Sequence, residues 1–339
     1  MKNSIIENIY SAVRKFKLNL AGLNVLTEAA TGNYVVTPVI AALGGARVIT
    51  FSKDSQYGTY EEAKEQTVDL AKKCRVYENI TIVDSLDKIN LPEVDILTNT
   101  GFLRPINEAL IKRLPGYCVI PYMFEPWEYR QTDIDLDACK CKGIKVYGTN
   151  EGDPGLQTFR YIGYTVLYFL LKKKLSPFSA KLLLIGNEEF ANPVAEVLND
   201  NGYCFDILSD YSQEPIIDKY NAVIIAERRR SDCLVGSSKD SFIKAANIRD
   251  DMFVLHISGA VDFSNLKADY LPENPASFGY MSFNTDFIDP RAVIDLHTAG
   301  LKVGEGMVEA NNRGLVKEES RTFMEENYPA LAFDNPDLW

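Results

Sequence analysis

The sequence is poor in several features that would define a protein class. Its 339 residues contain two histidines, six cysteines without a C-x-x-C pair, and fewer basic than acidic residues, 36 against 47. The cysteine and histidine pattern argues against a zinc site. The net charge of -11 disfavours nucleic acid as a partner, because phosphate binding needs a basic face.

Long apolar segments are absent as well. The longest apolar run, residues 161–171, is too short to span a bilayer, and residues 1–20 have no apolar core of the signal-peptide type. The cysteines are best explained as free thiols in a reducing compartment. We therefore expect a cytoplasmic protein with no metal centre and no membrane span, whose partner is a small molecule. A locally positive pocket for one anionic ligand remains compatible with this composition.

Short apolar runs alternate with helical patterns along the whole chain, whose composition is 46% hydrophobic and 24% charged. Strands are expected over 24–27, 47–51, 80–83, 94–98, 117–121, 144–147, 181–185, 204–209, 222–226, 252–257 and 292–296. Helices are expected over 3–20, 34–43, 60–74, 106–114, 135–141, 158–172 and 193–201. Such alternation predicts parallel sheets covered on both faces. The expected fold is α/β, with two doubly wound Rossmann-like domains and a cleft between them.

The predicted boundary between these domains lies in the stretch 149–155, which is rich in Gly, Asp and Pro. We expect a flavodoxin-like substrate or catalytic domain over 1–150 and a Rossmann dinucleotide-binding domain over 151–300. Residues 301–339 are expected to form a C-terminal helix and an acidic tail. This tail either packs back on the first domain or stays mobile.

A dinucleotide-binding loop is expected after the strand over 181–185, where the G-x-G-x-x-G pattern stands in such folds. The residues at this place are Gly186, Asn187, Glu188, Glu189, Phe190 and Ala191. The first glycine is present, Glu188 replaces the second, and alanine replaces the third. Asp210 follows the next strand, where a carboxylate binds the ribose hydroxyls, and the residues after it supply no arginine for a 2′-phosphate. The pattern predicts NAD rather than NADP, bound by Gly186, Asn187, Phe190, Ala191 and Asp210.

The two glutamates of this loop oppose that prediction. A unit-charge pair at 4 Å is worth roughly 4 kcal/mol at an effective dielectric of 20. The start of a helix recovers only about 0.3–1 kcal/mol per negative group. The alternative is a Rossmann-like unit whose loop has lost tight cofactor binding.

Residues 132–146, TDIDLDACKCKGIKV, resemble the D-x-x-D-x-x-A-x-x-x-G-I-x-V segment of the D-2-hydroxyacid dehydrogenase (formate/glycerate dehydrogenase) superfamily. The long helix, strand, glycine loop and helix then follow in the order of that family, so the resemblance covers roughly residues 94–300. It implies a second domain that binds NAD, an active site in the cleft, and a homodimer formed through the cofactor domain. It also implies an oxidoreductase that transfers a hydride between NAD(H) and a small 2-oxo or 2-hydroxy acid.

The resemblance also indicates catalytic residues. His297, in LHTAG at 296–300, matches the family's acid/base histidine in its Pro-His-x-Ala-Gly context. The family's arginine belongs in an N-x-x-R-G-x-x-V-D segment, and the chain has LHISGAVD at 255–262, with the Val-Asp end and without the arginine. Arg130 and Arg228 are the candidate replacements that would bind the substrate anion. Trp127 beside Arg130 would stack on a substrate ring or pack in the core.

A second candidate ligand site lies in the first domain. Thr31, Gly32 and Asn33 follow a strand and precede a helix, where free N–H groups bind anions and where the same residues also act as ordinary caps. Residues 52–55 end the next strand at the same sheet edge. This loop supports the alternative function, a dehydrogenase-like protein that has lost hydride transfer and binds another small nucleotide or anionic ligand.

Overall fold

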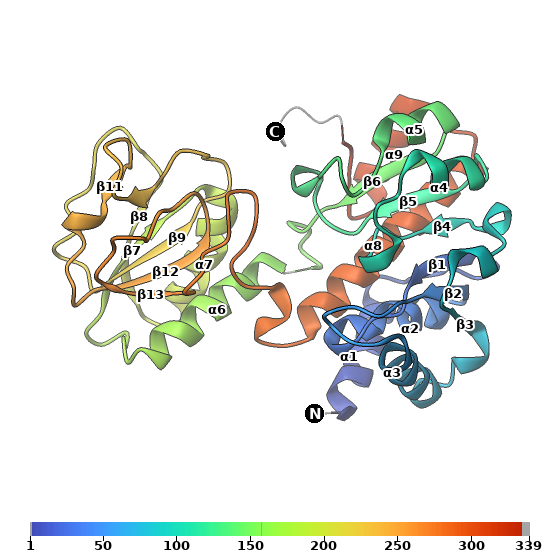
Figure 1. The fold of residues 1–339 in the computed structure, drawn as a ribbon, viewed down its shortest axis with the longest axis horizontal. Helices are drawn as coiled ribbons and strands as arrows, with labels where there is room; N and C mark the ends of the chain where they lie inside the picture. The colour runs from blue at the N-terminus through green and yellow to red at the C-terminus, as the bar shows by residue number, and fades with distance from the viewer. Residues whose placement is uncertain (1, 157, 334–339) are drawn as a thin grey trace. The chain divides into compact units, whose positions relative to one another are not determined.

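A computed structural model describes residues 2–156 and 158–333, and the chain divides into two compact units (Figure 1). The first unit contains Met1–Leu156 and Pro290–Trp339, and the second contains Gln157–Asp289. The chain thus leaves the first unit once and returns to it. Both expected boundaries, at 150 and 300, fall inside the first unit.

The first unit is built on a seven-stranded sheet in the order β3-β2-β1-β4-β5-β6-β14. Its strands are β1 (Asn24–Glu28), β2 (Arg47–Phe51), β3 (Ile80–Val83), β4 (Ile96–Leu97), β5 (Val119–Tyr122), β6 (Lys145–Thr149) and β14 (Ala330–Leu331). All pairs are parallel except β14 with β6. The six parallel strands stand where the sequence predicts them, in the Rossmann order 3-2-1-4-5-6 rather than in the expected flavodoxin-like order.

Alternation along the strands creates two cores. Val25 of β1 belongs to a core shared with α1, α2 and α8, whereas Leu26 belongs to a core shared with α4 and α5. The helices of this unit are α1 (Lys2–Lys15), α2 (Val36–Leu43), α3 (Tyr60–Lys73), α4 (Glu108–Arg113), α5 (Leu136–Lys142), α8 (Arg291–Asn312) and α9 (Lys317–Asn327). Successive side chains along a strand thus pack on opposite faces of the sheet, as a doubly wound sheet requires.

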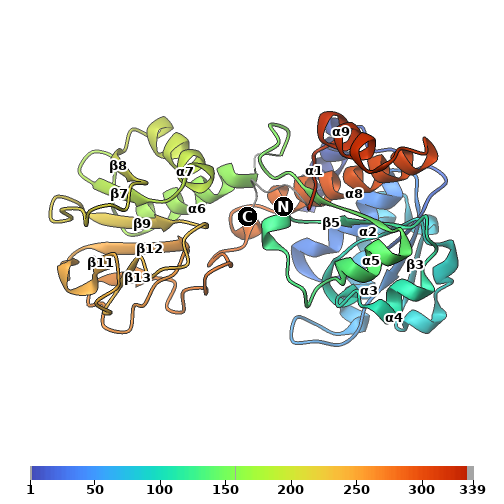
Figure 2. The ribbon, with the colours of Figure 1, turned by 90° about the horizontal axis from the view of Figure 1, so that it is seen from above.

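The expected strand over 292–296 is wrong, because these residues begin α8. Helix α8 contacts β5 and β6 as well as α1, α2 and α9 (Figure 2). Its side chains are therefore buried nearly all round, and a short apolar run of this kind has no periodicity that separates helix from strand. The segment after residue 301 packs back on the first unit as far as the structure describes it, through α9 and β14. Residues 334–339 of the predicted tail lie outside the described part of the chain.

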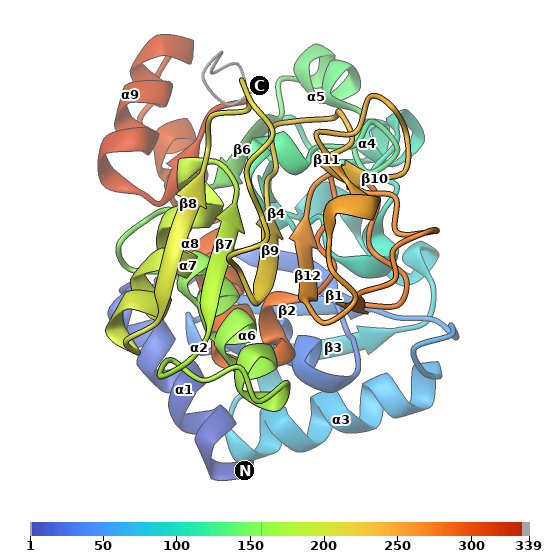
Figure 3. The same cartoon turned by 90° about the vertical axis from the view of Figure 1, so that its left-hand side faces the viewer.

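The second unit has a five-stranded parallel sheet in the order β8-β7-β9-β12-β13, whose first four strands lie side by side in Figure 3. Its strands are β7 (Lys181–Ile185), β8 (Cys204–Leu208), β9 (Ala222–Ala226), β12 (Phe253–Ser258) and β13 (Asp269–Leu271). A small parallel pair, β10 (Val235–Gly236) and β11 (Ile243–Lys244), follows β9. The strand order reverses between β7 and β9, which is the place where ligands bind to open α/β sheets.

Two helices, α6 (Thr158–Lys172) and α7 (Glu188–Asp200), pack against each other in this unit. Helix α7 begins at Glu188, before the expected start at 193. Pro193 favours the first position of a helix, but Glu188 and Glu189 favour the first turn through the helix dipole. Within residues 2–156 and 158–333, no helix has the length and apolar character that crossing a bilayer requires.

Candidate functional site

Gly186 directly follows β7 at the carboxyl edge of the second sheet. A Cβ atom there would lie 2.2 Å from the carbonyl oxygen of Ala226, so only glycine lets β7 and β9 approach this closely. The Cβ of Ala191 lies 3.5 Å from the same point. Phe190 is fully buried and packs against Phe159, with ring centroids 5.4 Å apart. Three residues of the predicted loop therefore build the strand-turn-helix junction itself.

The charges of the loop are arranged differently from the sequence-based expectation. Glu188 is exposed to solvent. Glu189 is held by two arginines that follow β9, because Arg229 Nη2 lies 2.7 Å from its Oε1 and Arg228 Nη2 contacts its Oε2. The repulsion expected between this carboxylate and a pyrophosphate is thereby offset. Arg228 is buried and contributes its charge to the loop rather than to an open anion clamp.

Two buried polar atoms flank the end of β9 without a hydrogen-bond partner among the described residues. They are Asn187 Oδ1, which follows β7, and Ser258 Oγ, which ends β12. Asn187 precedes α7 in an extended conformation and its side chain does not cap the helix. Buried oxygens are normally hydrogen-bonded, and both of these can accept from a hydroxyl or amide group. The described residues therefore leave two unused hydrogen-bond acceptors at this edge of the sheet.

Asp210 is exposed just beyond β8, at the predicted ribose position. Its two oxygens accept hydrogen bonds from Ser212, from the backbone N at 2.9 Å and from Oγ at 3.0 Å. The adjacent Tyr211 donates its hydroxyl to the buried Glu227, at 2.6 Å from Oε2. The carboxyl ends of β7, β8 and β9 thus bring the predicted cofactor residues to one edge.

His297 lies on α8 in the first unit and is buried, with 3% of its surface exposed. Its Nδ1 is 2.5 Å from Thr37 Oγ1, and its ring centroid is 5.8 Å from that of Tyr34. Burial lowers the pKa of His297 to about 4, so the imidazole is neutral at neutral pH. The structure thus brings the predicted histidine next to Tyr34, which directly follows the predicted loop residues Thr31, Gly32 and Asn33.

The loop itself is partly occupied by contacts within the first unit. Thr31 Oγ1 donates to the carbonyl of Tyr57 at 3.0 Å, and the amide of Gly32 donates to Gln66 Oε1 at 2.9 Å. Gly32 has a φ of +64°, which glycine adopts without strain. Asn33 follows it in the 3-10 turn Gly32–Val35. The amide expected to bind an anion at Gly32 is therefore already engaged.

Arg130 and Trp127 lie on the loop after β5, among carboxyl groups that the sequence analysis did not single out. Trp127 Nε1 donates to Glu125 Oε2 at 2.7 Å, and the amide of Glu151 donates to Glu125 Oε1 at 3.1 Å. Burial and the neighbouring Glu125 hold the pKa of Glu128 well above its usual range, although Arg130 opposes this shift. Glutamates that follow two adjacent strands, β5 and β6, were the available signal for this group.

Glu28, at the end of β1, is a further buried carboxyl group, and no sequence motif marks it. Its Oε1 accepts a hydrogen bond from the amide of Phe102 at 3.1 Å, and burial raises its pKa. A Cβ at Gly101 would lie 1.7 Å from this oxygen, and Gly101 has a φ of +41°. The glycine therefore makes room for the carboxyl group between the ends of β1 and β4.

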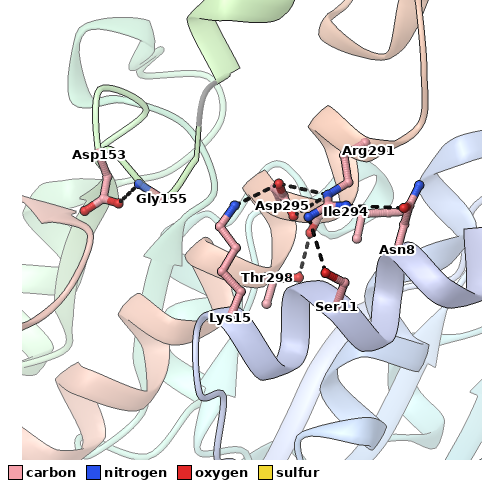
Figure 4. A network of polar contacts seen from close by, with 9 residues as sticks. All are labelled: Asn8, Ser11, Lys15, Asp153, Gly155, Arg291, Ile294, Asp295 and Thr298. Carbon is pink, nitrogen blue, oxygen red and sulfur yellow. Dashed lines mark hydrogen bonds and ion pairs between the residues drawn. The ribbon is translucent and has the colours of Figure 1, made fainter.

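Asp295 is close to His297 in the sequence, but its carboxylate forms ion pairs with residues of α1 and α8 and not with the histidine. It lies between Lys15 Nζ at 3.1 Å and Arg291 Nε at 3.1 Å, and Arg291 also reaches Asn8 and Ser11 (Figure 4). This network joins α1 to the start of α8. In the described part of the chain, no group of three or more His, Cys, Asp or Glu side chains is arranged to hold a metal ion.

The geometry defines a class: two α/β units with open, mostly parallel sheets, one of which carries a glycine turn at its strand-order reversal. No family model matches the sequence, and no curated protein matches it. Among solved structures, a dipicolinate synthase chain from Bacillus halodurans has a TM-score of 0.52 at 13% identity, over 86% of this chain and 98% of that one. A D-lactate dehydrogenase from Treponema pallidum has a TM-score of 0.52 at 10% identity, over 88% and 99%.

At these identities the likeness concerns the fold. The chain has the fold of two-domain Rossmann-type dehydrogenases, and the predicted resemblance to the D-2-hydroxyacid dehydrogenases is confirmed at that level.

Proposed function

We propose that this protein is an NAD(H)-dependent oxidoreductase that transfers a hydride between the cofactor and a small 2-oxo or 2-hydroxy acid, or a related anion. The observation that supports this most is the carboxyl edge of the second sheet. There Glu189 is neutralised by arginines, and the oxygens of Asn187 and Ser258 lack partners within the described residues. A pyrophosphate at the start of α7 would meet backbone N–H groups and no uncompensated carboxylate from Glu189.

The cofactor residues keep their predicted places in this proposal. Gly186 and Asn187 would face the pyrophosphate, Asp210 would accept from the ribose hydroxyls, and Phe190 and Ala191 would support the turn from the core. When bound, NAD(H) supplies the hydride acceptor or donor. Arg228 holds Glu189 and so acts as a positioning residue for the loop.

His297 is the proposed acid/base group. As a neutral imidazole it can take the hydroxyl proton of a 2-hydroxy acid, while the hydrogen on the same carbon leaves as hydride. Thr37 would fix the orientation of the ring through Nδ1. Arg130 would bind the substrate carboxylate, with Trp127 and the loop residues Thr31, Gly32 and Asn33 as further substrate contacts.

The setting of the enzyme is proposed as well. Six free cysteines fit a reducing cytoplasm, and the acidic net charge fits a small-molecule substrate rather than a nucleic acid. Tyr164, Tyr168 and Leu171 expose apolar surface along α6, which supports a homodimer through the second unit.

Calorimetric titration of NAD and NADH into the purified protein tests the proposal. We expect micromolar binding, weakened about tenfold in Asp210→Ala, which removes an exposed carboxylate at the ribose position. Asp250→Ala is the matched control, because Asp250 is an exposed aspartate that precedes β12 at the opposite sheet edge. Absence of binding at millimolar cofactor would refute the proposal.

Turnover separates the two functions that the sequence leaves open. NADH mixed with a panel of 2-oxo acids should lose its absorbance in the presence of the wild type and much more slowly with His297→Ala. NADH binding without turnover of any acid in the panel would favour the dehydrogenase-like protein that has lost hydride transfer. Full turnover by His297→Ala would remove that residue from the proposed chemistry.

A further inference from the structure

An arginine from a distant part of the sequence lies at the end of β8. The residues that follow Asp210 supply no basic side chain, yet Arg230, which follows β9, places its guanidinium carbon 4.3 Å from the ring centroid of Tyr211. Tyr211 is the direct neighbour of Asp210. Folding therefore brings a cation to the position where the sequence contains only a carboxylate.

Contacts on several sides hold this stack. The Tyr211 hydroxyl donates to Glu227, which also accepts from the amide of Arg229 at 2.7 Å. Phe242 packs edge-on against the Tyr211 ring, with centroids 5.2 Å apart. The guanidinium of Arg230 pairs with Asp232 and stays accessible, with 37% of its side chain exposed. The platform is thus ordered before any ligand arrives.

Among the three arginines that follow β9, Arg230 is the one whose ion pair a ligand can replace. Glu189 already engages Arg228 and Arg229. Both carboxylate oxygens of Asp210 accept hydrogen bonds from Ser212, so part of the hydrogen-bonding capacity of Asp210 is used within the turn over residues 210–212. Asp232, the partner of Arg230, is half exposed, and a surface pair of this kind contributes little and exchanges readily for a stronger anion.

We infer that the adenosine end of the dinucleotide site accepts a 2′-phosphate as well as a free 2′-hydroxyl, and that Arg230 is the residue that permits it. This inference rests on the proposed dinucleotide site. A guanidinium stacked on an aromatic ring still presents its N–H edge, and a phosphate dianion is its best bidentate partner. The charge of Arg230 offsets the repulsion that Asp210 would exert on the phosphate. The same site therefore binds either NADP(H) or NAD(H).

Titration calorimetry of NADH and NADPH against the full-length protein tests the inference. The wild type should bind both within about tenfold of each other. Arg230→Ala should weaken NADPH binding roughly tenfold or more and NADH binding less than about threefold. Added salt should weaken NADPH binding more steeply in the wild type than in the variant, since the variant lacks the charge pair.

Arg249→Ala is the matched control. Like Arg230, Arg249 belongs to the second unit, pairs with an aspartate two residues on, and has a side chain that is 37% exposed. Its removal should leave the ratio of the two affinities unchanged. Equal weakening of both nucleotides by Arg230→Ala, or NADH binding without NADPH binding in the wild type, would overturn the inference and leave the proposed function intact. Failure of both nucleotides to bind the wild type would overturn both.

Discussion

Glu189 illustrates how the meaning of one carboxylate depends on its neighbours. Judged by sequence, it stands beside the pyrophosphate position and repels it. In the folded chain it lies between two guanidinium groups, and the local charge is close to balanced. The arginines follow β9, so no sequence pattern around residue 189 predicts them. The electrostatic objection to cofactor binding therefore weakens once the partners of the side chain are known.

His297 makes the stability of the folded protein depend on pH. Its pKa is about 4 in the folded state and about 6.5 in an unfolded chain, so the unfolded state binds the proton first as the pH falls. Stability from this residue is fully present above pH 6.5 and is lost on the way down to pH 4. We expect a loss of about 2 kcal/mol in the free energy of unfolding at pH 5 from this group alone.

Urea denaturation at pH 7 and pH 5 measures this effect. Other groups also titrate in this range, so the comparison is with His297→Gln, which keeps a neutral polar side chain. The variant should lose less stability than the wild type between the two pH values, by about 2 kcal/mol. An identical pH dependence in both proteins would show that the histidine is not buried in its neutral form.

Helix α1 is attached to α8 by the Asp295 network. Asp295 has 5% of its side chain exposed, while its partners Lys15 and Arg291 are about a third exposed. Asp295→Asn would leave both cations beside a neutral amide, and their partial access to water limits the cost. We expect a loss of about 1–3 kcal/mol in the free energy of unfolding, with faster amide exchange in α1.

The matched control is Asp69→Asn on α3. Asp69 pairs with Lys73 one helical turn away, and more than half of its side chain is exposed. Exposed pairs of this type contribute about 0.3–0.5 kcal/mol. If Asp295→Asn cost no more than Asp69→Asn in urea denaturation, the network would not be what holds α1 on α8.

At the level of elements, the sequence predicted most of the fold because periodicity reports local structure. Strands β2, β3, β7 and β9 and helix α6 have the predicted bounds. The one wrong element has a tertiary cause. Residues 292–296 form part of a helix buried on nearly all sides, and such a run looks the same in a buried strand. The tertiary surroundings decide these cases, and local sequence does not contain them.

The candidate site was predictable to a smaller extent, because it depends on contacts across the whole chain. Gly186 and Asp210 could be predicted as cofactor residues because each stands at a fixed offset from a strand. The contact of Arg230 with Tyr211 and the approach of Tyr34 to His297 join segments that no motif links. Glu28 and Glu128 were missed because their unusual environment is created by burial. Sequence offsets identify residues within one strand, turn and helix. Packing between such segments determines which of these residues come into contact.

The proposed nucleotide site lies in the second unit and the candidate substrate loop lies in the first. Hydrogen exchange can therefore show which of the two binds the cofactor. If NADH binds at the strand-order reversal of the second sheet, it should slow amide exchange at residues 186–191, 208–212 and 226–230. At 100 times its dissociation constant it should also stabilise the folded state by about 2.7 kcal/mol. Hydrogen exchange followed by mass spectrometry, with and without NADH, measures the protected segments.

The control segment for that experiment is the loop 27–34 of the first unit. The loop is already hydrogen-bonded to neighbouring segments, as the bond from the Gly32 amide to Gln66 of α3 shows, so NADH alone should leave its exchange largely unchanged. A 2-oxo acid added with NADH should then slow exchange there if Thr31 and Asn33 contact the substrate. Protection of this loop by NADH alone, with residues 186–191 unaffected, would move the nucleotide site to the first sheet. In that case the strand-order reversal between β1 and β4, rather than the one between β7 and β9, would be the place where the molecule binds its ligand.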